Sequence, residues 1–262
     1  MNNEILMYIV VFIFGLVFGS FYNVVGYRLP KKESIAFPAS HCPNCNHKLK
    51  FYENIPVLSY IFLTGKCKVC KKKISIIYPL FELITGVLFL LSYMAFGLSI
   101  EFVSSIIITS VFIIISISDI RYYEIPDEVL IIGSILLVIT YIISSVINNV
   151  SFVIGVVKPV LYALGSFAIL YLIKILADFL FKKESLGGGD IKLMFFIGLA
   201  IGLDMSIVAI FISSFIALPL SIVTLLKKNT NVLPFGPYLA ISSIFILLTK
   251  LDINMVYNFF TN

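Results

Sequence analysis

The chain has 262 residues, of which 60% are hydrophobic and only 13% are charged. Its mean hydropathy is +1.07, and a soluble globular domain carries about 25% charged residues. These values exclude a single soluble domain, a disordered chain and a disulfide-stapled secreted domain. The same composition excludes a basic nucleic-acid-binding module as a description of the whole chain, and we expect no nucleic-acid partner. The net charge of +5 misleads when it is read for the whole chain, because the charges are clustered.

Apolar runs follow one another along most of the chain. They cover residues 5–25, 76–98, 102–118, 129–147, 159–181, 191–202, 206–226 and 238–248. A helix needs about 20 apolar residues to cross a bilayer. The sixth and eighth runs are short for this, and we interpret them as tilted or partly buried helices. The sequence therefore predicts an all-α polytopic membrane protein with six to eight transmembrane helices.

The first apolar run has two interpretations. A cleaved signal peptide has a basic start, a short apolar core and a small-residue cleavage site. Residues 5–25 are longer than such a core, follow no basic segment and lack a good cleavage site. A retained transmembrane helix is therefore favoured.

Positive charge marks one side of the predicted membrane protein. Ten of the 19 Lys and Arg residues lie in the polar stretch 28–73. With eight alternating spans, this stretch shares a side with the polar loops 119–128, 182–190 and 227–237. Because cytoplasmic loops are rich in Lys and Arg, we expect this side to face the cytoplasm and the N-terminus to lie outside. Membrane lipid is an expected partner of so basic a surface.

All four cysteines lie in this basic stretch, as two Cys-x-x-Cys pairs separated by 21 residues. They are Cys42, Cys45, Cys67 and Cys70. Paired cysteines with this spacing are typical of structural zinc sites, and a cytosolic setting argues against disulfides. The sequence predicts a small cytoplasmic zinc-binding domain inserted between helices 1 and 2. His41 and His47 flank the first pair as alternative ligands, but solvated histidines are the simpler interpretation.

Two aspartates lie at the edges of apolar runs. Asp119 ends the third run, and Asp190 opens the sixth directly after Gly187, Gly188 and Gly189. Charges at such positions are costly and usually functional. Taken singly, Asp119 is explained by pairing with Arg121, and Asp190 by capping a helix. Both, however, fall on the cytoplasmic side of the predicted topology, so one helical bundle can bring them together.

Paired carboxylates indicate a hydrolytic chemistry. Two close carboxyl groups share a proton, so that one acts as a general base on water while the other polarises the scissile carbonyl. This is the chemistry of aspartyl proteases. Three successive glycines allow a substrate strand to approach the backbone closely.

These residues and several further motifs resemble the bacterial type IV prepilin peptidases, also called prepilin leader peptidase/N-methyltransferases. The resemblance covers most of the chain. It includes residues 19–30, the four cysteines, the segment 52–60, residues 65–67 and 78–82, the Asp119 segment with Ile125-Pro126, the Gly-x-Gly-Asp motif running from Gly187 to Lys192, and residues 234–238.

The resemblance implies a membrane aspartyl protease of the Gly-x-Gly-Asp type in the bacterial cell membrane. Members cut the basic leader from prepilins and pseudopilins at the cytoplasmic face. They then methylate the new N-terminal residue with S-adenosyl-L-methionine. Asp119 and Asp190 carry over as the catalytic pair, and Gly187, Gly188, Gly189 and Lys192 as the active-site loop.

The resemblance also divides the chain by activity. Residues 1–27 form transmembrane helix 1, residues 28–75 the four-cysteine domain associated with methyl transfer, and residues 76–262 the protease core. No glycine-rich nucleotide loop identifies a methyl-donor site. The segment that contains Glu53, Asn54, Gly65 and Lys66 is the predicted methyltransferase site.

Two other functions remain as alternatives. One is a peptidase without methylation, like archaeal preflagellin peptidases, but those relatives lack the four-cysteine insertion. The other is a transporter or a membrane zinc module in which the aspartates serve as proton or ion sites.

Overall fold

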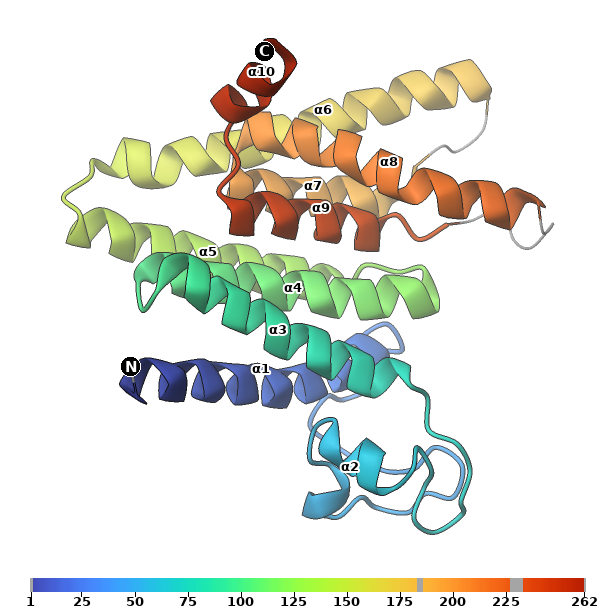
Figure 1. Ribbon diagram of the computed structural model, residues 1–262. Coiled ribbons are helices and arrows are strands. Elements are labelled where there is room, and N and C mark those ends of the chain that lie inside the picture. The colour runs from blue at the N-terminus through green and yellow to red at the C-terminus, as the bar shows by residue number, and fades with distance from the viewer. Residues whose placement is uncertain (1, 183–185, 227–232, 262) are drawn as a thin grey trace. The chain divides into compact units, whose positions relative to one another are not determined.

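The structure is a computed structural model that describes residues 2–182, 186–226 and 233–261 (Figure 1). Parts of two expected polar loops, residues 183–185 and 227–232, lie outside the described residues. Within the described chain the fold is helical, and β-structure is limited to two isolated bridges. This confirms the all-α class. The chain divides into two compact units, Met1–Leu98 and Ser99–Asn262.

Among the residues that the structure describes, six helices are long and apolar enough to cross a membrane, judged by length and composition. They are Glu4–Arg28, Ile77–Phe96, Ile100–Tyr122, Asp127–Ile147, Val153–Phe181 and Leu203–Thr224. Gly236–Thr249 is a shorter apolar helix. The polytopic membrane fold predicted from hydropathy is thus confirmed, at the lower end of the expected number of spans.

The first unit contains a closely packed helix pair, α1 (Asn2–Arg28) and α3 (Ile77–Phe96). Gly15 and Gly19 lie one turn apart on α1 and face α3. A Cβ at Gly15 would lie 2.8 Å from the Cα of Gly86, and one at Gly19 would lie 2.8 Å from the Cα of Glu82. Small residues spaced by four let membrane helices approach closely, and this contact sets how α1 and α3 pack.

A polar module connects the two helices. It contains the short 3₁₀ helix η1 (Phe51–Glu53) and the helix α2 (Leu58–Phe62). Glu82 of α3 is buried, and its Oε2 accepts a hydrogen bond from the Val57 N–H at 2.7 Å. Val57 has a φ of 60°, which a β-branched residue rarely adopts. The buried carboxylate therefore fixes the start of α2 against the helix pair.

The second unit is helical over most of its described residues. The bounds of its helices are α4 Ile100–Tyr122, α5 Asp127–Ile147, the π-helix η2 Val153–Val157, α6 Lys158–Phe181, α7 Gly188–Ile201, α8 Leu203–Leu226, α9 Gly236–Thr249 and α10 Ile253–Thr261. The Ser99 side chain accepts a hydrogen bond from the Phe102 N–H and caps α4. Gly202, with a φ of 83°, ends α7 and lets α8 begin at once.

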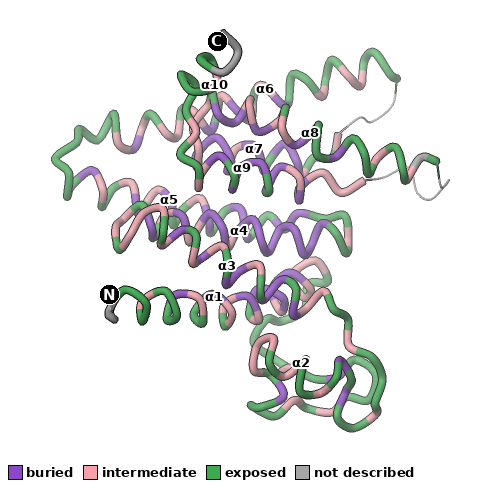
Figure 2. The backbone as a smooth tube through the Cα atoms, viewed as in Figure 1, coloured by how far each residue is buried: buried purple, intermediate pink, exposed green. Residues whose placement is uncertain are grey.

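The core of the second unit lies along α4, α7 and α9, where buried positions concentrate (Figure 2). Helix α7 is only 14 residues long but buries Leu193, Met194, Phe196 and Ile197 completely. A helix as short as α7 can lie in the core because neighbouring helices, rather than lipid, surround it. The interpretation of the sixth and eighth apolar runs as partly buried helices agrees with this arrangement.

Candidate functional site

Asp119 lies in the last turn of α4 and is only 6% exposed. Its Oδ2 accepts a hydrogen bond of 3.0 Å from the backbone N–H of Gly236, at the start of α9. Among the described residues, Asp119 forms no ion pair with Arg121, the partner that a purely interfacial role required. The carboxylate instead points into the helical bundle.

Asp190 lies in the first turn of α7 and is 9% exposed. The N-cap of this helix is Gly187, so Asp190 does not cap it. Its Oδ1 is buried without a hydrogen-bond partner among the described residues. The carboxyl group is close enough to Asp119 for the two charges to interact. The structure thus brings the two candidate aspartates together in one unit.

The glycine segment before Asp190 leaves its backbone open on one side. A Cβ at Gly188 would meet no atom within 4 Å, whereas one at Gly189 would lie 3.1 Å from Ile125. Gly188 is exposed and is the first residue of α7, whose third residue is the buried Asp190. The backbone at Gly188 is therefore unobstructed on the side where a Cβ would lie.

Lys192 lies on another face of α7. Its Nζ is 2.7 Å and 2.8 Å from the two carboxylate oxygens of Asp127, the first residue of α5. Both side chains are half exposed. Lys192 therefore joins the start of α5 to α7, and its place in the active-site loop stays a prediction.

The four cysteine sulfurs of the first unit form one cluster, within 4.8 Å of one another. The Cys42–Cys70 and Cys45–Cys67 Sγ separations are 3.8 Å and 3.9 Å. Four thiolates bound to zinc at about 2.3 Å in a tetrahedron lie about 3.8 Å apart. The donor set and its spacing therefore fit a zinc ion, and none of the four is in a disulfide.

The two Cys-x-x-Cys loops share one backbone design. The N–H of Cys42 donates to the His47 carbonyl, and the N–H of Cys67 donates to the Lys72 carbonyl, each at 2.9 Å. Backbone N–H groups of Cys70 and Val69 lower the pKa of the Cys67 thiol to about 6. Because the thiolate is the form that binds metal, these N–H groups favour the metal-binding form of Cys67.

His41 and His47, the alternative ligands, lie outside the cysteine cluster. His41 is exposed, and its Nδ1 contacts the Ala39 carbonyl. The Nε2 of His47 is 2.9 Å from Glu53. The metal-ligand cluster formed by the described residues comprises the four cysteines without either histidine.

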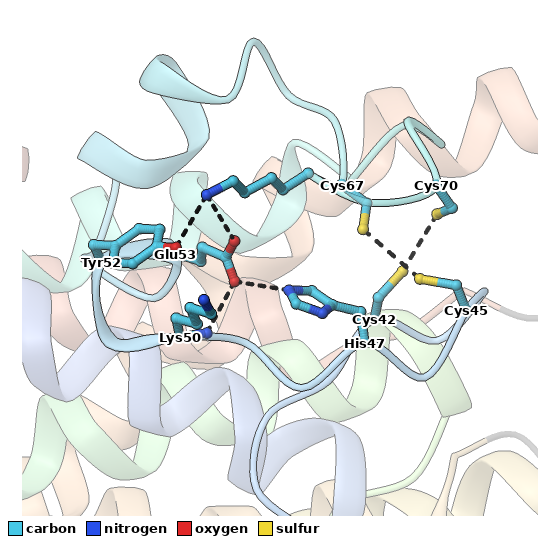
Figure 3. A network of polar contacts seen from close by, with 9 residues as sticks. Cys42, Cys45, His47, Lys50, Tyr52, Glu53, Cys67 and Cys70 are labelled. Carbon is cyan, nitrogen blue, oxygen red and sulfur yellow. Dashed lines mark hydrogen bonds and ion pairs between the residues drawn. The ribbon is translucent and has the colours of Figure 1, made fainter.

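Glu53 is surrounded by polar groups from both cysteine loops and from η1 (Figure 3). Its Oε2 accepts hydrogen bonds of 2.9 Å from the Lys50 N–H and from His47 Nε2. Lys68 Nζ lies 3.9 Å from Oε1. The Lys50 N–H, followed by His47 and Lys68, holds the pKa of Glu53 below its usual value despite burial. Glu53 is therefore a buried, charged carboxylate.

The other predicted methyltransferase residues lie on the segment that follows Glu53. Asn54 and Lys66 are exposed, whereas Gly65 is buried. Gly65 has a φ of 66°, and a Cβ there would lie 2.9 Å from the Tyr60 hydroxyl. A positive φ favours glycine here, and a side chain would have to displace the Tyr60 ring. These residues share one short segment, and their role in methyl transfer stays a prediction.

Gly236 is a site residue to which sequence reasoning gave no role. It lies 117 positions from Asp119 and offers a backbone N–H, which no side-chain pattern reveals. The signal that could have indicated it is the Gly-Pro pair that opens an apolar run after a polar loop. A proline in the first turn marks the start of a helix. The first N–H groups of a helix have no partner within it and can therefore bind a side chain such as that of Asp119.

Two family models match the chain. The Bacterial Peptidase A24 N-terminal domain matches residues 13–96, and the Type IV leader peptidase family matches residues 106–222. The first match contains the cysteine cluster, and the second contains Asp119 and Asp190. No solved structure matches the chain.

Curated relatives match over almost the whole length. The chain is 35% identical to the prepilin leader peptidase/N-methyltransferase of Bacillus subtilis (strain 168), covering 90% of this chain and 91% of that protein. It is 33% identical to the protein of the same name from Neisseria gonorrhoeae, covering 88% and 86%. It is also 33% identical to the type 4 prepilin-like proteins leader peptide-processing enzyme of Escherichia coli O78:H11, covering 88% and 89%. With this identity over most of both chains, the protein belongs to the type IV leader peptidase family.

Proposed function

We propose that this chain is an aspartic endopeptidase that removes the basic leader from type IV prepilins or pseudopilins, and that it then N-methylates the new N-terminal residue with S-adenosyl-L-methionine. The observation that carries the peptidase is the pair of buried carboxyl groups, Asp119 and Asp190, beside the open backbone of Gly188. Relatives that match most of the chain bear names with both activities.

The carboxyl pair supplies the groups that peptide hydrolysis needs. One carboxylate takes a proton from a water molecule as its oxygen attacks the scissile carbonyl carbon. The other carboxyl group, protonated, donates to the carbonyl oxygen. When the carbon–nitrogen bond breaks, the departing amine takes up the proton that the first carboxylate took from water, and the second carboxylate recovers its proton as the new carbonyl forms. The Gly236 N–H keeps Asp119 oriented throughout.

The substrate class suits the position of the pair. A prepilin has a basic leader followed by an apolar helix, and that helix can lie in the bilayer beside the enzyme. Asp119 lies in the last turn of a candidate membrane span, and Asp190 in the first turn of a short apolar helix. The leader junction would then meet the pair near the membrane surface. The distribution of Lys and Arg supports a cytoplasmic active site and an N-terminus outside.

The cysteine cluster supports a structural zinc ion with four protein ligands and no open position for catalysis. When bound, the metal would hold the two cysteine loops together in a module of little apolar core. We assign methyl transfer to this module, in the segment that contains Glu53, Asn54, Gly65 and Lys66. The protease core is then residues 76–262, with Gly187, Gly188, Gly189 and Lys192 as its active-site loop.

The carboxyl pair is tested by replacing each aspartate separately. Asp119→Asn and Asp190→Asn should both abolish cleavage of a coexpressed prepilin, as measured by mass spectrometry of the pilin N-terminus. Asp→Glu changes should also fail, because one added methylene displaces the carboxyl group. The matched control is Asp204→Asn, an exposed position in the first turn of α8, which should cleave normally. Full cleavage by either active-site Asn variant would refute the protease assignment and favour a transporter.

A further inference from the structure

Glu53 is more deeply buried than its local role requires. Its side chain is 1% exposed, in a module where most side chains are at least partly exposed. Burying a carboxylate is costly unless it is paired and hydrogen-bonded. Capping of the three-residue helix η1 needs only the hydrogen bond from the Lys50 N–H. The remaining contacts of Glu53 therefore call for a separate explanation.

One set of contacts reaches the first cysteine loop. Glu53 Oε2 holds the ring of His47 at 2.9 Å. The backbone of His47 in turn holds a metal-ligand residue. Its carbonyl accepts a hydrogen bond from the Cys42 N–H at 2.9 Å, and the Asn46 N–H donates back to the Cys42 carbonyl at 2.9 Å. A displacement of His47 would therefore move Cys42 and the loop that carries it.

The other set reaches the second cysteine loop. Lys68 lies between Cys67 and Cys70 in the sequence, and its Nζ is 3.9 Å from Glu53 Oε1. The same ammonium donates a 3.0 Å hydrogen bond to the Tyr52 hydroxyl and lies 4.7 Å from the centre of the Tyr52 ring. Adjacent residues of η1 thus hold Lys68 from two directions. The single side chain of Glu53 contacts both loops (Figure 3).

We propose that Glu53 is a positioning residue that holds the two cysteine loops in register for metal binding. It acts on the first loop through His47 and on the second through Lys68. This inference rests on the proposed metal site and extends it to a residue outside the ligand set. Groups that orient metal ligands from outside typically change metal affinity by about 10- to 100-fold when removed.

The same contacts argue against a direct contact between Glu53 and a soluble methyl donor. Oε2 is occupied by His47 and the Lys50 N–H. Oε1 accepts no hydrogen bond among the described residues, but it is buried, with Lys68 as its nearest cation. A methyl donor would have to displace Lys68 to reach Oε1 of Glu53. An effect of Glu53 on methylation therefore acts through the position of the loops.

The test measures how fast the full-length membrane protein, purified with zinc, loses metal to a chromogenic chelator. Glu53→Gln keeps the size of the side chain and removes its charge. We expect it to lose zinc about tenfold faster than the parent chain. The matched control is Glu33→Gln, an exposed glutamate of the same polar stretch, which should release zinc at the parental rate.

A double-variant cycle separates positioning from a general loss of stability. If Glu53 acts through His47, His47→Gln with Glu53→Gln should release zinc no faster than Glu53→Gln alone, because interacting residues are not additive. A cadmium-113 NMR spectrum of the substituted protein should shift in Glu53→Gln and not in Glu33→Gln. If the two substitutions instead increase the rate of zinc release independently, so that their effects multiply in the double variant, the proposed action of Glu53 through His47 would be overturned.

The outcomes keep this inference apart from the proposed function. A parent chain that binds no zinc refutes the metal site itself. A parent that holds about one zinc per chain, with Glu53→Gln releasing it at the same rate, refutes the positioning role alone. Prepilin cleavage by each variant serves as the check that the second unit is intact, since Glu53 belongs to the first.

Discussion

Asp119 is oriented by a main-chain group. The Gly236 N–H donates to its Oδ2 at 3.0 Å, and both residues are buried. A hydrogen bond to an ionised acceptor is stronger than one between neutral groups. The glycine also leaves room for the carboxylate, because a Cβ at this position would lie 2.8 Å from Oδ2. Gly236 therefore both donates to Asp119 and makes space for it.

Gly236→Ala should reduce prepilin cleavage by about 100-fold, since a displacement of about 1 Å at a catalytic group costs this much. The N–H donor remains, so the loss would come from the displaced carboxylate. The measurement is the cleavage rate in membranes at equal enzyme levels. Gly165→Ala is the control: its added Cβ would meet only the flexible end of Leu203, at 3.1 Å. Equal cleavage by both variants would contradict the role of Gly236.

At the scale of elements, the helix pair α1 and α3 illustrates how a membrane contact is built without polar side chains. Gly15 and Gly19 bring α1 against the backbone of α3 at Gly86 and Glu82. Among lipids, helices gain little from hydrophobic burial, so close packing of small residues stabilises the pair. A larger side chain at this contact would have backbone atoms, which cannot move aside, as its nearest neighbours.

Gly15→Val should therefore separate α1 from α3 and lower the thermal stability of the first unit by several degrees, as expected for a loss on the order of 1–3 kcal/mol from overpacking. The measurement is thermal unfolding in detergent, followed through the loss of the cysteine-bound metal. Ile13→Val, on an exposed part of α1, is the control and should unfold at the parental temperature. An unchanged temperature for Gly15→Val would show that α1 and α3 tolerate a wider spacing.

The elements show how far sequence reasoning extends. Hydropathy identifies the long helices because their apolar runs are about as long as a bilayer is thick. The sequence also identifies Asp119 and Asp190, because charge is conspicuous at the edge of an apolar run, and the four cysteines, because their spacing is local. It does not identify the contact of Gly236 with Asp119 or that of Glu82 with Val57. Both join a side chain to a backbone N–H far along the chain. A Gly-Pro pair can mark the start of a helix, but the sequence does not show which distant side chain its N–H groups contact.

At the scale of the whole molecule, the candidate residues for the two activities fall in different compact units. The cysteine cluster and the segment from Glu53 to Lys66 belong to Met1–Leu98, and the carboxyl pair belongs to Ser99–Asn262. Hydrolysis as proposed here needs the carboxyl pair, a water molecule and an aligned strand. Methyl transfer needs a second pocket for a charged, soluble donor. We therefore expect the two activities to be separable by substitution.

Cys67→Ser with Cys70→Ser should yield pilin that is cleaved but largely unmethylated. Loss of two ligands would remove the proposed metal, which would stabilise a module with little apolar core, whereas the carboxyl pair belongs to the other compact unit. The decisive quantity is the methylated fraction among cleaved pilin molecules, measured by mass spectrometry. A partial fall in cleavage is compatible with a module that also holds the leader. A methylated fraction equal to that of the parent would place the donor site outside this module.

The first unit contributes two candidate membrane spans, α1 and α3. An even number of crossings returns the chain to the side of the membrane on which it began. The whole unit could therefore be gained or lost in one recombination event near Leu98, and the second unit would keep its orientation. Loss of a single helix from the pair would instead invert everything that follows. Because its number of crossings is even, the first unit can be gained or lost as a whole without inverting the second unit. Its two helices cannot be gained or lost one at a time without that inversion.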